Sequence, residues 1–182
     1  MNKSGVVVVA ALCMLAGIGI GYAAKPAPPG VAVFKGKVAR DAGQAALLEA
    51  EQLAGDGSWE LIAIGRIYYL SGDKAKGESL FARVTGKKPE PSDWQRIGEV
   101  YAEAGEFSKA DVYFQKVLAA GPKDDTGQSE IGAWYVQFGQ RDKGEELFTK
   151  AMQRNPGDLW HYVRAAESFL GVKCTRAFPV VG

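Results

Sequence analysis

The sequence predicts an all-α fold, a right-handed α-solenoid of stacked antiparallel helix pairs. A glycine, a phenylalanine and a proline recur at one spacing along the chain. Successive members are 33 and 34 residues apart: Gly65, Gly98 and Gly132; Phe81, Phe114 and Phe148; Pro89, Pro122 and Pro156. A fixed period of this length is typical of solenoids, in which each repeat packs mainly on its neighbours. The hydrophobic content of 47% is ample for the continuous core that such stacking needs.

Residues 91–124, the middle helix pair, show the pattern most clearly. Ser92 is expected to cap the first helix through its hydroxyl, with Gln95 completing a capping box. Gly105 is expected to end that helix, because glycine accepts the left-handed backbone of a helix terminus. Residues at steps of three and four give each helix one apolar face: Trp94, Ile97, Tyr101 and Ala104 in the first, and Ala110, Phe114 and Val117 in the second.

These landmarks resemble the tetratricopeptide repeat, a 34-residue helix–turn–helix pattern. The resemblance covers three copies, at about 58–90, 91–124 and 125–157. Gly77 and Gly144 depart from the family pattern, since it prefers alanine there. If the helix spacing permits a methyl group, Gly77→Ala is expected to stabilise the domain by about 0.5–1 kcal/mol. The third copy matches least well, so its first helix is expected to be the least firmly packed.

Residues 1–24 differ in kind from the repeats. Lys3 precedes an apolar run, and small residues stand just before Lys25, an order that predicts a secretory signal peptide. The alternative is an uncleaved membrane anchor, since about 20 apolar residues can also span a bilayer. Cys13 lies inside the run, but the residues before it match a lipoprotein cleavage box poorly.

The remaining segments flank the repeats and complete a domain over 37–171. Residues 25–36 form a proline-rich linker, and 37–54 resemble a lone second helix that would cover one end of the stack. Residues 158–171 predict one more helix, with Asp158 as its N-cap. It is expected to dock on the third repeat through Leu159, Tyr162, Ala166 and Phe169. Residues 172–182 show no period and form a C-terminal tail.

The sequence offers little that could carry catalysis. Charge is balanced, with 22 basic and 21 acidic residues, so no basic excess indicates nucleic acid. His161 is the only histidine, so no histidine pair could bind zinc, and it is interpreted as a surface or packing residue. No glycine-rich phosphate loop is present. We therefore predict no enzyme activity, no cofactor and no catalytic or metal-binding residue.

Cys174 would be the only cysteine left after signal-peptide cleavage. An odd thiol in an oxidising compartment suggests a reactive group, or a covalent homo-oligomer formed through Cys174 or the tail. The alternative is a small buried apolar side chain.

The resemblance implies a concave groove, lined by the first helices, that binds a protein or peptide segment. The family's groove places fall on these residues: Trp59, Ile62, Arg66, Tyr69 and Leu70 in the first copy; Ser92, Gln95, Glu99, Ala102 and Glu103 in the second; Thr126, Ser129, Ala133, Val136 and Gln137 in the third; Val163 and Glu167 in the closing helix. One end would be apolar and the middle acidic. For Trp59 and Tyr69, burial under the N-terminal helix is the alternative.

The sequence thus predicts an exported protein–protein interaction module, an adaptor or assembly factor that is periplasmic or secreted in a bacterial envelope. Two alternatives remain at this stage. The first is a scaffold of an envelope assembly or secretion system, anchored in the inner membrane by residues 5–24. The second is a self-assembling structural protein.

Overall fold

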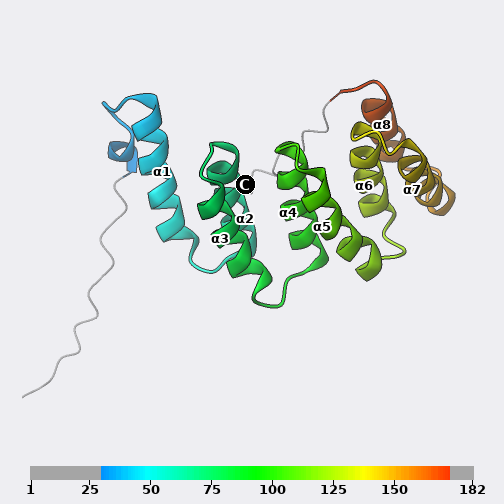
Figure 1. Cartoon of the computed structure of the whole chain (residues 1–182), viewed down its shortest axis with the longest axis horizontal. Helices are drawn as coiled ribbons and strands as arrows, with labels where there is room; N and C mark the ends of the chain where they lie inside the picture. Colours follow the sequence, from blue (N-terminus) through cyan, green and yellow to red (C-terminus); the bar gives the residue numbers. More distant parts are fainter. Residues whose placement is uncertain (1–29, 173–182) are drawn as a thin grey trace, which may run out of the picture.

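The computed structural model describes residues 30–172, where it contains eight α-helices, one short 3-10 helix and no strand. The elements are η1 (Gly30–Val33), α1 (Ala39–Ala54), α2 (Ser58–Leu70), α3 (Lys74–Thr85), α4 (Pro91–Glu103), α5 (Phe107–Ala120), α6 (Asp125–Gln137), α7 (Arg141–Arg154) and α8 (Leu159–Phe169). Figure 1 shows them as antiparallel neighbours in one curved row. The predicted all-α fold of stacked helix pairs is confirmed. The signal peptide or anchor, residues 25–29 of the linker and Cys174 lie outside the described residues.

The three pairs α2–α3, α4–α5 and α6–α7 are the three repeats, and aromatic rings join one repeat to the next. The ring of Tyr101 lies edge-on to Tyr69 of the preceding repeat, with 5.2 Å between centroids. Phe107 meets Tyr135 of the following repeat in the same way, at 5.4 Å. Edge-on rings attract one another beyond the area they bury. The recurring aromatic residues therefore hold the stack together as well as each pair.

Within each repeat the two helices cross at small residues. A methyl group on Gly77 would lie 2.8 Å from the carbonyl oxygen of Gly65 and 2.8 Å from the Cβ atom of Tyr69. A methyl group on Gly144 would lie 2.7 Å from the carbonyl oxygen of Gly132. The expectation that Gly77→Ala stabilises the domain is therefore wrong. The condition attached to it, room for a methyl group, is not met because the two backbones touch.

The helix ends agree with the sequence in part. Gly105 ends the first helix of the middle repeat with a φ of +77°, and Asp158 caps α8 by accepting a hydrogen bond from the amide of Trp160. The expected cap at Ser92 is wrong: α4 begins at Pro91, two residues before the start that a cap at Ser92 implies, and its capping box is formed by Glu90 and Asp93. Proline suits this first helical position because its missing N–H would find no partner there.

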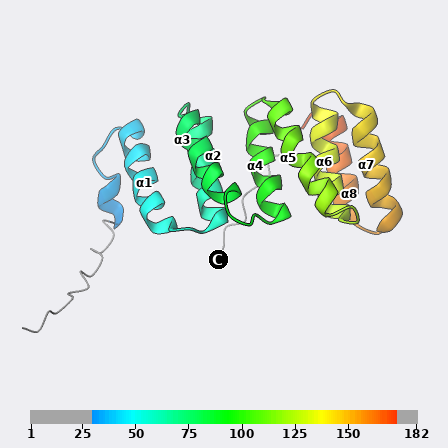
Figure 2. The same ribbon diagram turned by 60° about the horizontal axis from the view of Figure 1, so that its bottom comes forward.

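The docking face of α8 is also different from the expected one. His161 and Ser168 are buried on the side that faces α6, whereas Leu159, Tyr162 and Phe169 are exposed. Figure 2 shows α8 lying beside α6 and α7. α8 takes the place of a first helix in the repeat order. It therefore packs on α6 through the same face that α4 and α6 use to pack on the first helix of the preceding repeat. α6 is consequently covered on two sides and is well buried, contrary to the expectation for the third copy.

A cluster of charges joins the first repeat to the second. The carboxylate of Glu106, just before α5, accepts a hydrogen bond from the Tyr69 hydroxyl at 2.8 Å and pairs with Lys109 at 3.0 Å and with Lys74. The contact with Lys74, followed by those with Lys109 and Tyr69, lowers the pKa of Glu106 to about 2.

Among residues 30–172, no helix is both long enough and apolar enough to cross a membrane.

We expect Gly77→Ala to destabilise the protein by about 1–3 kcal/mol, because a methyl group forced into a packed crossing displaces backbone. The measurement is the free energy of unfolding from urea titration of dilute protein. The matched control is Gly43→Ala in α1, where a methyl group would meet no heavy atom within 4 Å. This control should be stabilised by about 0.5–1 kcal/mol. Equal stabilisation of both variants would show that the crossing can relax.

Candidate partner-binding surface

The candidate surface is the concave face, defined here as the side of α2, α4, α6 and α8 that carries the predicted groove residues. On α2 this face presents a stripe at steps of three and four, formed by Trp59, Arg66 and Leu70 with Ala63 between them. Trp59 and Leu70 are 43% and 41% exposed, so both offer apolar surface to solvent. Arg66 stands between them and donates a hydrogen bond to Glu103 of α4 at 2.6 Å.

Several predicted groove residues do not lie at the surface. Tyr69 is buried against Phe81 and Tyr101, and its hydroxyl points to Glu106 rather than into the groove. A partner therefore cannot reach it, and its placement in the groove is wrong. The same correction applies to the other fully packed side chains of the set, which are Ile62, Ala102, Ser129 and Ala133.

The other predicted residues are accessible to different degrees. Gln95 and Glu99 are polar but buried, so they offer a partner hydrogen bonds and no contact area. Half-buried positions are Glu103, Val136, Gln137, Val163 and Glu167, while Ser92 and Thr126 are exposed. The accessible apolar surface of the predicted groove is thus concentrated at the α2 end.

Polar contacts along the concave face link each first helix to the next. Gln95 of α4 donates hydrogen bonds to Glu99, at 3.2 Å, and to Glu130 of α6. Glu130 also accepts a hydrogen bond from Arg164 of α8 at 2.7 Å. Buried polar groups cost free energy unless they find partners, and here they find them across helix boundaries. We call this set, together with the pair of Arg66 and Glu103, the polar ladder.

Trp59 begins the concave face at its N-terminal end. The guanidinium carbon of Arg96, on α4, lies 3.7 Å from the centroid of the Trp59 ring. A stacked guanidinium is attracted by the negative face of an indole and fixes its orientation. Trp59 is therefore held in place by a neighbouring repeat while part of its surface stays open to solvent.

His161 closes the opposite end of the face. It is fully buried between α6 and α8, and its Nδ1 atom lies 3.1 Å from the Ser129 hydroxyl. Its Nε2 atom lies 3.7 Å from a carboxylate oxygen of Asp125 and 3.8 Å from one of Asp158. The interpretation of His161 as a packing residue agrees with this position, since it lies inside a helix interface.

The C-terminal end of the described chain returns to the same face. After α8 the backbone turns at Gly171, where φ is +71°, and the Val172 carbonyl oxygen accepts a hydrogen bond from Gln137 at 2.8 Å. Gln137 is one of the predicted groove residues, and it is used here to hold the end of α8 against α6.

Sequence reasoning missed Arg96, Glu130 and Arg164. A signal was present, because these three residues are 34 apart and so occupy one place in successive repeats, with alternating charge. No three His, Cys, Asp or Glu side chains within residues 30–172 lie close enough to hold a metal ion. The arrangement can bind and orient a partner through apolar contact and hydrogen bonds.

Comparisons with known proteins support the repeat and the fold. Residues 94–124 match the family model of the tetratricopeptide repeat. Human Superkiller complex protein 3 is 33% identical over 73 residues, which are 40% of this chain but only 5% of the human protein. The crystal structure of MamA has a similar fold, with a TM-score of 0.51 and 16% identity over 72% of this chain and 80% of that chain. The predicted tetratricopeptide repeat is confirmed at residues 94–124, and the repeat match together with the similar fold supports a protein–protein interaction module.

A double-mutant cycle should show that the polar ladder stabilises the stack. We expect Glu130→Ala and Arg164→Ala to couple by about 1.5–3 kcal/mol in unfolding free energy, because each leaves the other's charge without its short hydrogen bond. The control cycle is Glu146 with Lys150 on α7, a short but exposed pair. It should show a coupling of no more than about 0.5 kcal/mol. Coupling between Glu130 and Arg164 no larger than this would mean that the ladder adds no more than an exposed ion pair does.

Proposed function

We propose that this chain is an exported protein–protein interaction module, an adaptor or assembly factor that binds a partner segment on its concave face. The observation that carries the proposal is the α2 stripe. Trp59 and Leu70 expose apolar surface on either side of the paired Arg66 and Glu103. A few anchors of this kind dominate the energy of most interfaces, and tryptophan and arginine are enriched among them.

The stripe suggests the chemistry of the partner segment. One apolar side chain of the partner would pack on Trp59 and another on Leu70, and a polar group would contact the ion pair between them. Because Trp59 is oriented by Arg96, it loses little conformational freedom on binding. Trp59 and Leu70 therefore replace Tyr69 as the proposed anchors, since Tyr69 is buried.

We place the protein in the periplasm or outside a bacterial cell, with attachment to the inner membrane as the alternative. The support is the order of residues 1–24, in which Lys3, an apolar run and small residues precede Lys25. An anchored form would act as a scaffold for an assembly or secretion system at the membrane. The proposed work is non-catalytic in either form.

Export should leave a shortened chain. The intact mass of the protein purified from its native envelope should correspond to a start at Ala24 or Lys25, because the small residues before these positions suit signal peptidase. Recovery of the full-length chain in the membrane fraction would instead support the anchored scaffold.

Changes in the α2 stripe should abolish partner capture without unfolding the domain. Trp59→Ala and Leu70→Ala should each weaken binding by more than about 1 kcal/mol, or at least fivefold, because each removes an apolar anchor. The measurement is affinity capture from envelope extracts, followed by titration of the captured partner, with thermal unfolding as the check on folding. Lys116→Glu, on an exposed part of α5, is the control and should bind as the wild type does. If only the control change lowers binding, the partner uses the outer face.

A further inference from the structure

Each end of the described stack carries half of a repeat. α8 occupies the place of a first helix, since Leu159 lies 34 residues after Asp125, where α6 begins. α1 occupies the place of a second helix, because 15 residues separate Gly43 from Ser58, the same number that separates Gly144 from Leu159. The chain therefore has a first helix without its second helix at one end, and the converse at the other.

The unpartnered face of α8 has the chemistry of an internal one. Tyr162, Ala165, Ala166 and Phe169 stand at the places that Trp94, Ile97, Gly98 and Tyr101 fill in α4. In complete repeats the second helix covers this face, and Tyr135 of α6 is 1% exposed. At the same place in α8, Phe169 is 45% exposed. Large apolar side chains in this arrangement indicate an interface that the described chain does not complete.

α1 offers the matching second-helix face. Gly43, Leu47 and Ala50 stand at the places of Ala110, Phe114 and Val117 in α5. Leu47 and Ala50 pack partly against the core, but a methyl group on Gly43 would meet no heavy atom within 4 Å. Gly77 and Gly144, at the same place in complete repeats, touch the backbone of their first helix. η1 lies against α1 but leaves this position open.

The small residues of the two ends also fit one another. The complete repeats cross at Gly65 with Gly77, at Gly98 with Ala110, and at Gly132 with Gly144. The ends would cross at Ala166 with Gly43, again two small residues, although here the alanine lies on the first helix, where each complete repeat has glycine.

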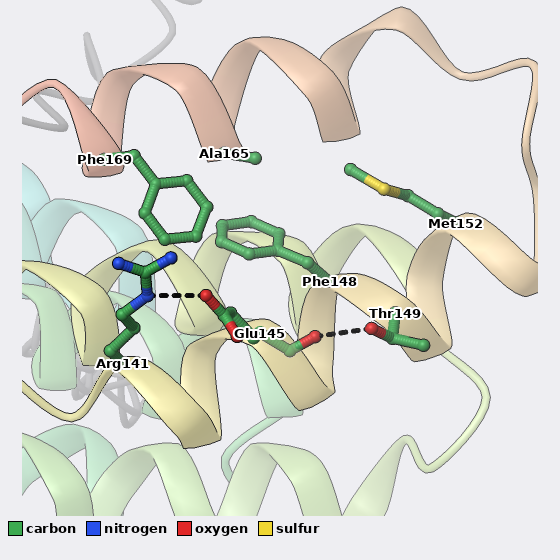
Figure 3. Close-up of a pocket in the computed structure, with 7 residues that line it drawn as sticks. All are labelled: Arg141, Glu145, Phe148, Thr149, Met152, Ala165 and Phe169. Atoms are coloured by element: carbon green, nitrogen blue, oxygen red, sulfur yellow. Dashed lines mark hydrogen bonds and ion pairs between the residues drawn. The ribbon is translucent and has the colours of Figure 1, made fainter.

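A cavity of about 360 Å³ lies where the missing second helix would pack. Figure 3 shows Ala165 and Phe169 of α8 facing Phe148 and Met152 of α7 across it. Second helices also touch their predecessors, as in the 2.8 Å ion pair between Glu78 of α3 and Lys109 at the start of α5. Glu145 of α7 occupies the place of Glu78 but pairs with Arg141, and Ala42 fills the place of Lys109 in α1, so this ion pair is not repeated at the junction.

We propose that α1 of a second copy packs against α7 and α8 and completes a fourth repeat, which joins molecules head to tail. The contact is heterologous, since each copy offers α8 to one neighbour and α1 to the other, so it extends into a chain or closes into a ring. It uses the two ends of the stack.

The test uses two variants of the purified protein, each blocked at one end. Gly43→Glu places a charge on α1, and Ala166→Glu places one on α8, both at exposed positions. Sedimentation equilibrium under reducing conditions, at up to about 1 mM protein, measures the average mass. The wild type should grow beyond a dimer with concentration, and each variant alone should stay monomeric. A mixture of the two should form a one-to-one heterodimer, because the unblocked α8 of one variant can bind the unblocked α1 of the other. The heterodimer should grow no further, because both of its remaining ends are blocked.

Val112→Glu, at an exposed apolar position of α5, is the control and should assemble as the wild type does. Two results would overturn the proposal. One is a wild-type protein that stays monomeric throughout this range. The other is an assembly that Gly43→Glu and Ala166→Glu leave intact. Partner capture is a separate measurement, so failure here leaves the proposed function standing.

Discussion

The close crossing of two helices at small residues is the constraint on which the rest of this structure depends. Because Gly65 and Gly77 have no side chains, the backbones of α2 and α3 touch there, and no room is left for a methyl group. The large residues around this contact then pack closely together. In the third repeat the carbonyl oxygen of Gly132 likewise leaves no room for a methyl group on Gly144. This spacing sets the pitch of each repeat, and the pitch decides which side chains of one repeat reach the next. The aromatic contacts between repeats and the polar ladder both follow from it.

The parts of the fold that local chemistry controls could be predicted from the sequence. Periodic glycines, aromatic residues and prolines determine where helices begin, cross and end, so the stack of pairs followed from them. The cap of α4 was misplaced by two residues, because Ser92 and Glu90 can both serve as caps and only the helix start decides between them. The face by which α8 docks was also missed. Apolar residues were assumed to point inward, but they point to a second helix that is absent from the described residues.

The candidate site was less predictable than the fold because burial depends on neighbouring repeats. Tyr69 and Ser129 stand at places that are open in the family pattern, yet Tyr101 covers the first and His161 the second. A repeat-by-repeat assignment treats each first helix as if its neighbours were identical. Here the neighbours differ, and the differences decide which positions remain for a partner. At the α2 end the concave face stays accessible, because the contacts between repeats cover Trp59 and Leu70 only in part.

The alternation of charge at one place of the first helices has a consequence for how this protein can evolve. Arg96, Glu130 and Arg164 occupy one place in successive repeats, and Glu130 contacts Arg164 directly. Loss of the third repeat would bring α8 against α4, so that Arg164 would stand beside Arg96 where a carboxylate now lies. Like charges held close together in a partly buried site repel strongly. The repeats are therefore not interchangeable units. The charges between them depend on their order and number, so duplication or deletion of a repeat would require compensating substitutions on both sides of the new junction.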